Sequence, residues 1–305
     1  MQEHVGHAWA VLRRAAAEAR ADRLTTTAQA LAYSLFLAIP AAFLVLLGLF
    51  SLFADAGTVA ELVSRAGMVL PSEATTLLEQ SLERAIQQPG RGAVITAVGL
   101  LLGIWTTTSA AATLMYGLTT TYGREDSRGF VRKRLVAFGI VIALAIGAAL
   151  VLGLLVFGPY LERWIGSATG ASALVAWIWW TAQWPILIGG LLFAFAAVLY
   201  LGPDVEQPRW RLVTPGAVTA LVVWMVASGG FALYAAWFGS YDKSWGTLSA
   251  VVVTLIWLWL TSAALLFGAE VNAEVRRLAE KHADAVEQDD VGHGSSDAGG
   301  LATSD

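Results

Sequence analysis

The chain has 305 residues, of which 57% are hydrophobic and only 14% are charged, and its net charge is -4. A soluble domain usually carries about 25% charged residues, so these charges are too few to cover a water-soluble globule of this size. The sequence contains no cysteine, which excludes disulfides, thiolate metal sites and cysteine nucleophiles.

Six apolar stretches are each long enough to cross a bilayer as a helix. A hydrocarbon core about 30 Å thick needs about 20 such residues. We therefore predict an all-α fold, a polytopic membrane helix bundle whose membrane domain covers residues 28–275. The predicted spans are residues 28–54, 93–118, 135–157, 173–201, 213–238 and 248–269.

The segments outside these spans differ in character. Residues 1–27 predict a cytoplasmic interfacial helix without a cleavable signal. Apolar residues recur at helical spacing over 59–70 and 74–86, which predicts two short amphipathic helices in the first extracytoplasmic loop. The tail, 276–305, is rich in Gly, Ser and Asp, and we expect disorder from about residue 284.

Basic residues predict the orientation. Of the 19 lysine and arginine residues, 14 lie in the N-terminal segment, the loops after the second and fourth spans, and the C-terminal tail. Because cytoplasmic flanks carry the excess of lysine and arginine, six spans with both termini in the cytoplasm fit this distribution. We expect a multi-pass protein of the cell (inner) membrane.

Polar residues inside the first, second and fourth spans are candidates for a substrate site. Gln29, Tyr33 and Ser34 lie near the cytoplasmic end of the first span. Thr107 belongs to a run of hydroxyl residues in the second span, and it either lines a cavity or bonds to the carbonyl one turn earlier. Gln183 stands two residues before Pro185, which frees a helix carbonyl, and Gln183 either satisfies that carbonyl or lines a cavity.

The sixth span ends with Glu270 and Asn272. An ionisable residue within a span is a functional candidate by default, although a solvated or arginine-paired helix end is an alternative. Small residues at Gly139, Ala143 and Gly147 favour close helix packing within the chain or, alternatively, a homo-oligomer interface.

Five groups of residues, taken together, resemble one known family. They are Ala32-Tyr33-Ser34 with Ile39-Pro40; Leu199-Tyr200 with Pro203; Pro215-Gly216-Ala217; Phe231, Tyr234, Phe238, Ser240 and Tyr241 before Trp245-Gly246; and Gly268-Ala269-Glu270 with Asn272-Ala273. Their order and spacing over about residues 24–280 resemble the YihY/BrkB family of bacterial and archaeal inner-membrane proteins. The chain departs from the family pattern at Ala41, at Trp245, and at Thr119 or Thr120, where the family has an asparagine.

The resemblance implies topology more than chemistry. Members have carried a ribonuclease BN label that is regarded as misassigned, and others have been linked to serum resistance or to the movement of lipids. The leading hypothesis is a transporter or lipid-translocating protein without its own ATPase, and the alternative is a non-transporting envelope scaffold or interaction protein. No hydrolase or nuclease constellation occurs in the sequence, so we expect no enzyme activity, catalytic residues, cofactor, metal or nucleic-acid partner, and membrane lipids as the main partners.

Overall fold

The computed structural model describes residues 2–53, 89–147, 165, 172–205, 213–238 and 247–300, and all regular structure in these residues is helical. This confirms the all-α prediction. The helices are α1 (Gln2–Ala21), α2 (Leu24–Phe53), α5 (Pro89–Thr121), α7 (Ser172–Leu201), α8 (Pro215–Phe238) and α10 (Thr247–Gly300). A further helical segment covers 130–147.

Most predicted spans coincide closely with these helices. Four helices are long and apolar enough to cross a membrane among the residues searched, over Leu24–Ala41, Trp177–Leu201, Pro215–Tyr234 and Ala250–Lys281. α5 covers the second predicted span, but it is not among these four helices. Its run of hydroxyl residues at 106–109 makes it less apolar than they are. Of the third predicted span, 135–157, the structure describes only the part up to residue 147. The two amphipathic helices predicted at 59–70 and 74–86 lie outside the described residues.

The structure differs from prediction in the C-terminal tail. We expected disorder from about residue 284, but α10 continues as a helix of 54 residues to Gly300, a length of about 80 Å. Propagating an existing helix costs little, because each added residue also gains a backbone hydrogen bond. The stretch 273–290 is rich in Ala, Glu and Arg, which favour helix.

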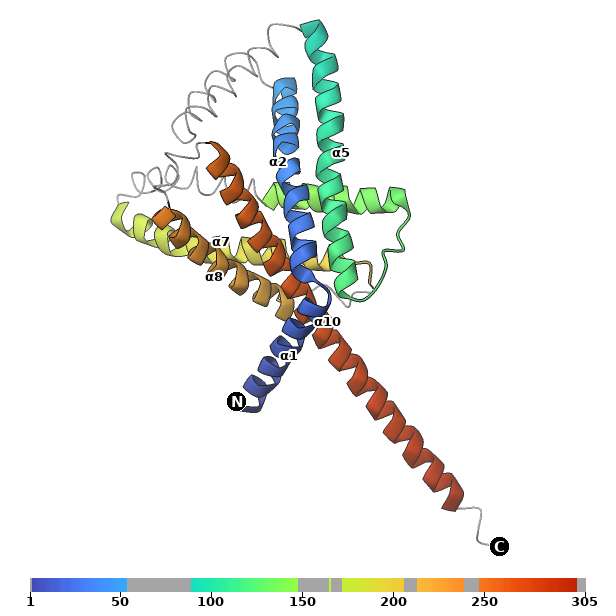
Figure 1. Cartoon of the computed structure of the whole chain (residues 1–305). Coiled ribbons are helices and arrows are strands. Elements are labelled where there is room, and N and C mark those ends of the chain that lie inside the picture. The colour runs from blue at the N-terminus through green and yellow to red at the C-terminus, as the bar shows by residue number, and fades with distance from the viewer. Residues whose placement is uncertain are drawn as a thin grey trace.

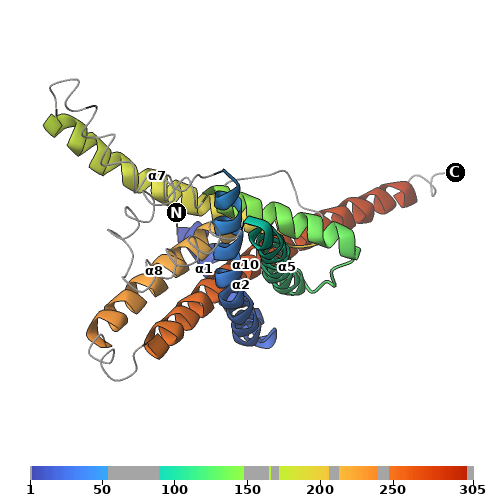
Figure 2. The ribbon, with the colours of Figure 1, turned by 90° about the horizontal axis from the view of Figure 1, so that it is seen from above.

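The helices form two crossing pairs. α2 packs beside α5, and α8 packs beside α10, while α10 also contacts α2 and α1. Figure 2 views α2 and α5 nearly along their axes, whereas α7, α8 and α10 lie across the view. The C-terminal half of α10 projects away from the other helices (Figure 1).

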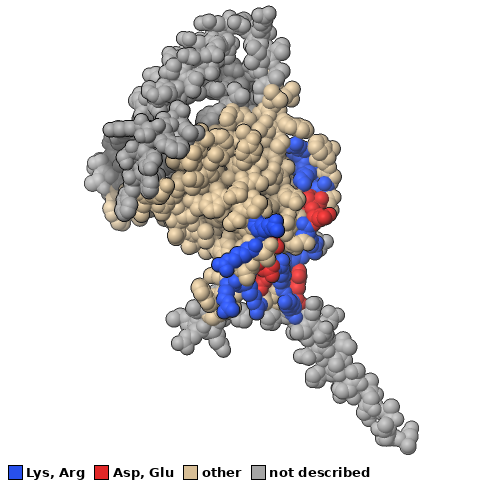
Figure 3. All heavy atoms as spheres, in the orientation of Figure 1, with Lys and Arg blue, Asp and Glu red and all other residues tan. Residues whose placement is uncertain are grey.

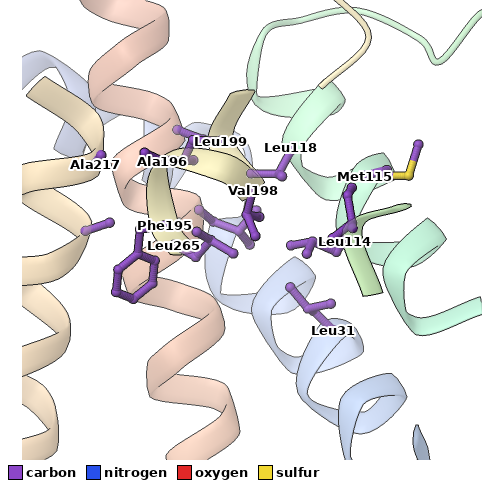
Figure 4. Packing of buried hydrophobic residues seen from close by; sticks show 14 of the residues in the cluster. Leu31, Leu114, Met115, Leu118, Phe195, Ala196, Val198, Leu199, Ala217 and Leu265 are labelled. Atoms are coloured by element: carbon purple, nitrogen blue, oxygen red, sulfur yellow. The ribbon is translucent and has the colours of Figure 1, made fainter. Parts of the chain in front are cut away.

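The buried core lies where the pairs cross. Figure 4 shows Leu31 of α2, Leu114 and Leu118 of α5, and Leu265 of α10 packed together with the C-terminal part of α7. α7 contributes an unbroken buried run over 195–199, and α8 contributes Ala217. Many apolar side chains outside this core are exposed, as expected of helices that face lipid.

Two glycines allow α8 and α10 to cross at backbone contact. A Cβ atom added at Gly268 would lie 2.5 Å from the Gly216 carbonyl oxygen and 2.7 Å from the Ala220 Cβ. A Cβ added at Gly216 would collide with the Gly268 carbonyl oxygen. Small residues serve this purpose in membrane helix pairs, because they let backbones approach. The crossing therefore fixes both the position and the rotation of α10.

We predict that Gly268→Ala lowers the free energy of unfolding by about 1–3 kcal/mol, the usual cost of overpacking. Gly229→Ala is the matched control, because a Cβ there meets nothing within 4 Å. Thermal unfolding of both variants in the same detergent gives the comparison. Equal midpoints for Gly268→Ala and Gly229→Ala would show that the crossing is not close.

Candidate functional site

The segments predicted to lie on the cytoplasmic side meet at one end of the structure. Gly117 near the end of α5 approaches Thr27 of α2 and Leu266 of α10. Trp259 of α10 donates a hydrogen bond to the Thr25 carbonyl oxygen, 3.4 Å away. Figure 3 shows the lysine, arginine, aspartate and glutamate side chains gathered around this end. Two polar clusters lie there.

α10 presents different residues to α8 and to α1. Asn272 accepts a hydrogen bond from the Gly216 backbone N–H at 2.8 Å, and its amide lies 3.4 Å from the Thr214 hydroxyl. Gly268 and Asn272 are one turn apart and both contact α8. Glu270 follows Gly268 by two residues, about 200° around the helix, so it lies on the opposite face with Glu274.

Glu270 is buried although it is ionisable. Its exposed fraction is 1%, and its Oε2 atom has no hydrogen-bond partner among the described residues. The charged groups that face it are Asp22 and Glu18, at the end of α1, and Arg277 of α10. Since two of these three groups are acidic, a charge on Glu270 would lie beside more negative than positive groups.

Ion pairs join α1 to the same face of α10. Arg14 lies 3.5 Å from Glu274, and Arg277 lies 3.7 Å from Glu18 and 3.9 Å from Glu274. We call Glu18, Asp22, Glu270 and Glu274 the α1–α10 carboxylate cluster. Among the residues searched, no three His, Cys, Asp or Glu side chains are grouped so as to hold a metal ion.

A second cluster holds the loop 124–129 against the end of α7. Asp204 accepts hydrogen bonds at Oδ2 from the Ser127 backbone N–H (2.8 Å) and hydroxyl (2.7 Å), and its Oδ1 lies 3.0 Å from Arg128 Nε. Arg128, whose side chain is 5% exposed, also donates to the Gly202 carbonyl at 2.8 Å. Asp126 pairs with Lys133 at 2.9 Å. We call this arrangement the loop clamp.

Thr119 joins the loop clamp to α5. Its hydroxyl accepts a hydrogen bond from the Asp204 backbone N–H at 3.1 Å and donates to the Met115 carbonyl at 2.7 Å. Thr119 is buried. Thr119, one of the two positions that can correspond to the family's asparagine, therefore has a structural role, which a hydroxyl group fulfils here.

The pKa of Asp204 is lowered, chiefly by the Ser127 hydroxyl hydrogen bond and also by Arg128, against an opposing effect of burial. A carboxylate with a lowered folded-state pKa stabilises the fold above its usual pKa, and this contribution is lost as the pH falls through the folded-state value. The contribution of Asp204 to the loop clamp is therefore present at neutral pH and lost in acid.

The structure does not bring the seven predicted site residues into one site. Gln29 and Tyr33 are exposed, Tyr33 by 60%. Ser34 and Thr107 donate to carbonyls one turn earlier, at 3.0 and 2.6 Å, so the back-bonding alternative describes Thr107. Gln183 is half-buried in α7. Asn272 fixes the start of α8, and Glu270 alone is buried with an unpartnered oxygen.

Sequence reasoning missed the loop clamp and named only Glu270 of the carboxylate cluster. The loop after the second predicted span was interpreted from its basic residues alone, yet Asp126 and Ser127 within it order the loop. The signal available was the acidic and hydroxyl residues among the arginines, together with Asp204 in the facing loop. For the carboxylate cluster, the signal was the spacing of Glu270 and Glu274, which places both on one helix face.

We predict that Asp204→Asn lowers the free energy of unfolding at neutral pH by about 2 kcal/mol, because a charged partner of the buried Arg128 is lost. The difference from wild type should shrink as the pH falls below about 4, the usual pKa of an aspartate in the unfolded chain, and through the lower pKa of Asp204 in the folded protein. Glu125→Gln, on an exposed residue of the same loop, is the matched control. A pH-independent difference, or an equal loss in Glu125→Gln, would contradict the role of the loop clamp.

Known proteins similar to this chain are membrane proteins or carry a ribonuclease-like name. The chain is 27% identical over 203 residues to "Putative ribonuclease-like protein YfkH" of Bacillus subtilis, covering 67% of this chain and 73% of that protein. It is 26% identical over 226 residues to UPF0761 membrane protein YihY of Escherichia fergusonii, covering 70% of each. A UPF0761 membrane protein of Laribacter hongkongensis is 30% identical over 211 residues, 68% of this chain and 46% of that protein.

The chain thus spans less than half the length of the Laribacter protein. No solved structure matches the chain. The family model described as Virulence factor BrkB matches residues 15–291 and so includes both clusters. The chain therefore belongs to the BrkB family, as the sequence resemblance implied.

Proposed function

We propose that this chain is a proton-linked transporter or lipid-translocating protein in which Glu270 carries the proton. It has six spans, two amphipathic helices in the first outer loop, and both termini in the cytoplasm. The observation that carries the proposal is Glu270, a buried carboxyl group with an unpartnered oxygen in an apolar helix. Such groups mark ion and proton pathways in membrane proteins, because burying them without a use is costly.

The surroundings of Glu270 supply a way to convert proton binding into movement. When Glu270 releases its proton, the new negative charge faces Asp22 and Glu18 and repels the end of α1. When Glu270 binds a proton, the repulsion ends, and the pairs of Arg14 and Arg277 with Glu274 and Glu18 hold α1 against α10. Proton binding thus selects between an open and a closed contact of α1 with α10.

The turn between α1 and α2 is suited to act as the hinge. Arg23 has a φ of 51°, a left-handed conformation that is uncommon for a residue with a side chain. Asp22 lies beside it in the turn, so a shift of the Asp22 carboxyl changes the direction in which the chain enters α2. α2 starts at Leu24 and contacts α5 along its length, which carries the movement into the membrane domain.

The second candidate is a non-transporting scaffold. The observation that favours it is the projection of α10 beyond the other helices, which gives a long helical surface for a partner (Figure 1). The ribonuclease-like name of the Bacillus relative has no support in this chain, since no nuclease constellation was found in the sequence.

We predict that Glu270→Gln abolishes the pH-gradient-dependent movement of a fluorescent phospholipid across the bilayer of proteoliposomes, because an amide cannot exchange the proton. Glu280→Gln is the matched control: Glu280 lies on the same helix, is exposed and pairs with Arg276 at 2.8 Å. It should move lipid as fast as wild type. Thermal unfolding of each variant verifies folding.

Two outcomes would contradict the proposal. Equal lipid movement by wild type and Glu270→Gln would remove Glu270 from the mechanism. Movement by wild type no faster than in protein-free liposomes would exclude lipid translocation and favour the scaffold.

A further inference from the structure

α1 pairs its charges on the side that faces α10. Glu18 lies 3.7 Å from Arg277, and Arg14 lies 3.5 Å from Glu274. Ala15, between these two residues of α1, is buried. The ion pairs involve only about one turn of each helix, so α1 crosses α10 here and does not follow it. Figure 1 shows the two helices diverging from this crossing.

The opposite side of α1 is basic and exposed. Trp9, Arg13, Ala17 and Arg20 follow one another at spacings of three or four residues, which places them in one row along the helix. All four are exposed, Trp9 by 69%. Among the described residues, neither Arg13 nor Arg20 lies in an ion pair. We call this row the outer stripe of α1.

The outer stripe adjoins the start of the first span. α1 ends at Ala21, and the apolar segment that is long enough to cross a membrane begins at Leu24. Arg20 stands only four residues before this segment, on the side that the basic flanks predict to be cytoplasmic. This is the depth of the lipid headgroups, outside the hydrocarbon core.

The composition of the outer stripe is complementary to an anionic membrane surface. A cytoplasmic leaflet that contains anionic lipids has a negative surface potential, which attracts arginines beside a span. Tryptophan is enriched at the headgroup level, where its ring and its N–H group meet apolar and polar surroundings. A helix with basic and aromatic residues along one side lies in the plane of the interface. Because the outer stripe is attached directly to a span, lipid is a better fit than a soluble acidic protein.

We propose that α1 docks on the cytoplasmic surface of the membrane through its outer stripe. Arg13 and Arg20 contact the phosphates of anionic phospholipids, and Trp9 lies at the headgroup level. Lipid then holds α1 on one side while α10 holds it on the other, so the lipid composition of the leaflet acts on the same helix contact as the ion pairs of Arg14 and Glu18. The proposal does not depend on proton binding by Glu270 or on transport.

A spin label on the outer stripe tests the proposal in the full chain. The chain contains no cysteine, so Ala17→Cys provides a single attachment site for a nitroxide. Electron paramagnetic resonance measures how accessible the nitroxide is to a neutral, water-soluble nickel chelate, in nanodiscs of phosphatidylcholine with or without phosphatidylglycerol. Phosphatidylglycerol should shield the nitroxide from the chelate. A nitroxide on Glu280→Cys, an exposed position of α10, should stay accessible in both kinds of nanodisc.

The arginines of the outer stripe are tested in the same assay. Arg13→Gln/Arg20→Gln should lower the ratio of docked to undocked α1 by about thirtyfold, about fivefold for each arginine near an anionic surface. Arg124→Gln/Arg132→Gln is the matched control, because it removes the same charge from two other exposed arginines. It should leave the shielding unchanged. Thermal unfolding verifies that each variant folds.

Three outcomes would overturn the proposal. Equal accessibility in the two kinds of nanodisc would do so without any variant. An equal loss of shielding in Arg124→Gln/Arg132→Gln would indicate only a response to net charge. Shielding in lipid-free detergent that increases with protein concentration would assign the outer stripe to a second copy of the chain.

Discussion

The close crossing of α8 and α10 at Gly216 and Gly268 is the constraint on which the rest of the structure depends. It leaves no freedom in the rotation of α10, because the two backbones touch. With Gly268 and Asn272 turned toward α8, Glu270 and Glu274 must face α1. α10 therefore carries its contact with α8 and the candidate proton site at Glu270 within two turns. Because the helix is rigid over this length, a shift of α10 at one contact changes the other.

The two polar clusters differ in how their charges are balanced. In the loop clamp, Asp126 and Asp204 face Arg128 and Lys133, and the charges compensate one another. In the α1–α10 carboxylate cluster, four acidic side chains face Arg14 and Arg277. Glu270 and Glu274 are the buried members of this cluster, whereas Glu18 is half-buried and Asp22 is exposed. In the function we propose, the loop clamp is a static anchor, and the carboxylate cluster is the element that responds to its surroundings.

The sequence predicted the helices well, because long apolar runs and flanking charges are strong signals. The fourth predicted span, 173–201, differs from α7 by one residue at its start. The side of each helix that packs in the core was predicted poorly, since a helix that is apolar all around gives no periodic signal for its buried side. Tyr33 was selected as polar and turned out to be exposed, and Thr107 bonds to its own helix. Contacts between distant segments, such as Asn272 with Gly216, have no local signal at all.

The central claim is that the buried Glu270 binds and releases a proton, and carbodiimide labelling tests it most directly. A hydrophobic carbodiimide reacts with protonated carboxyl groups that lie in apolar surroundings, and peptide mass spectrometry identifies the modified residue. The account predicts modification of Glu270 in the folded protein, with little at the exposed Glu280, and loss of labelling as the pH is raised. Labelling of Glu280 with Glu270 unmodified at every pH would contradict it.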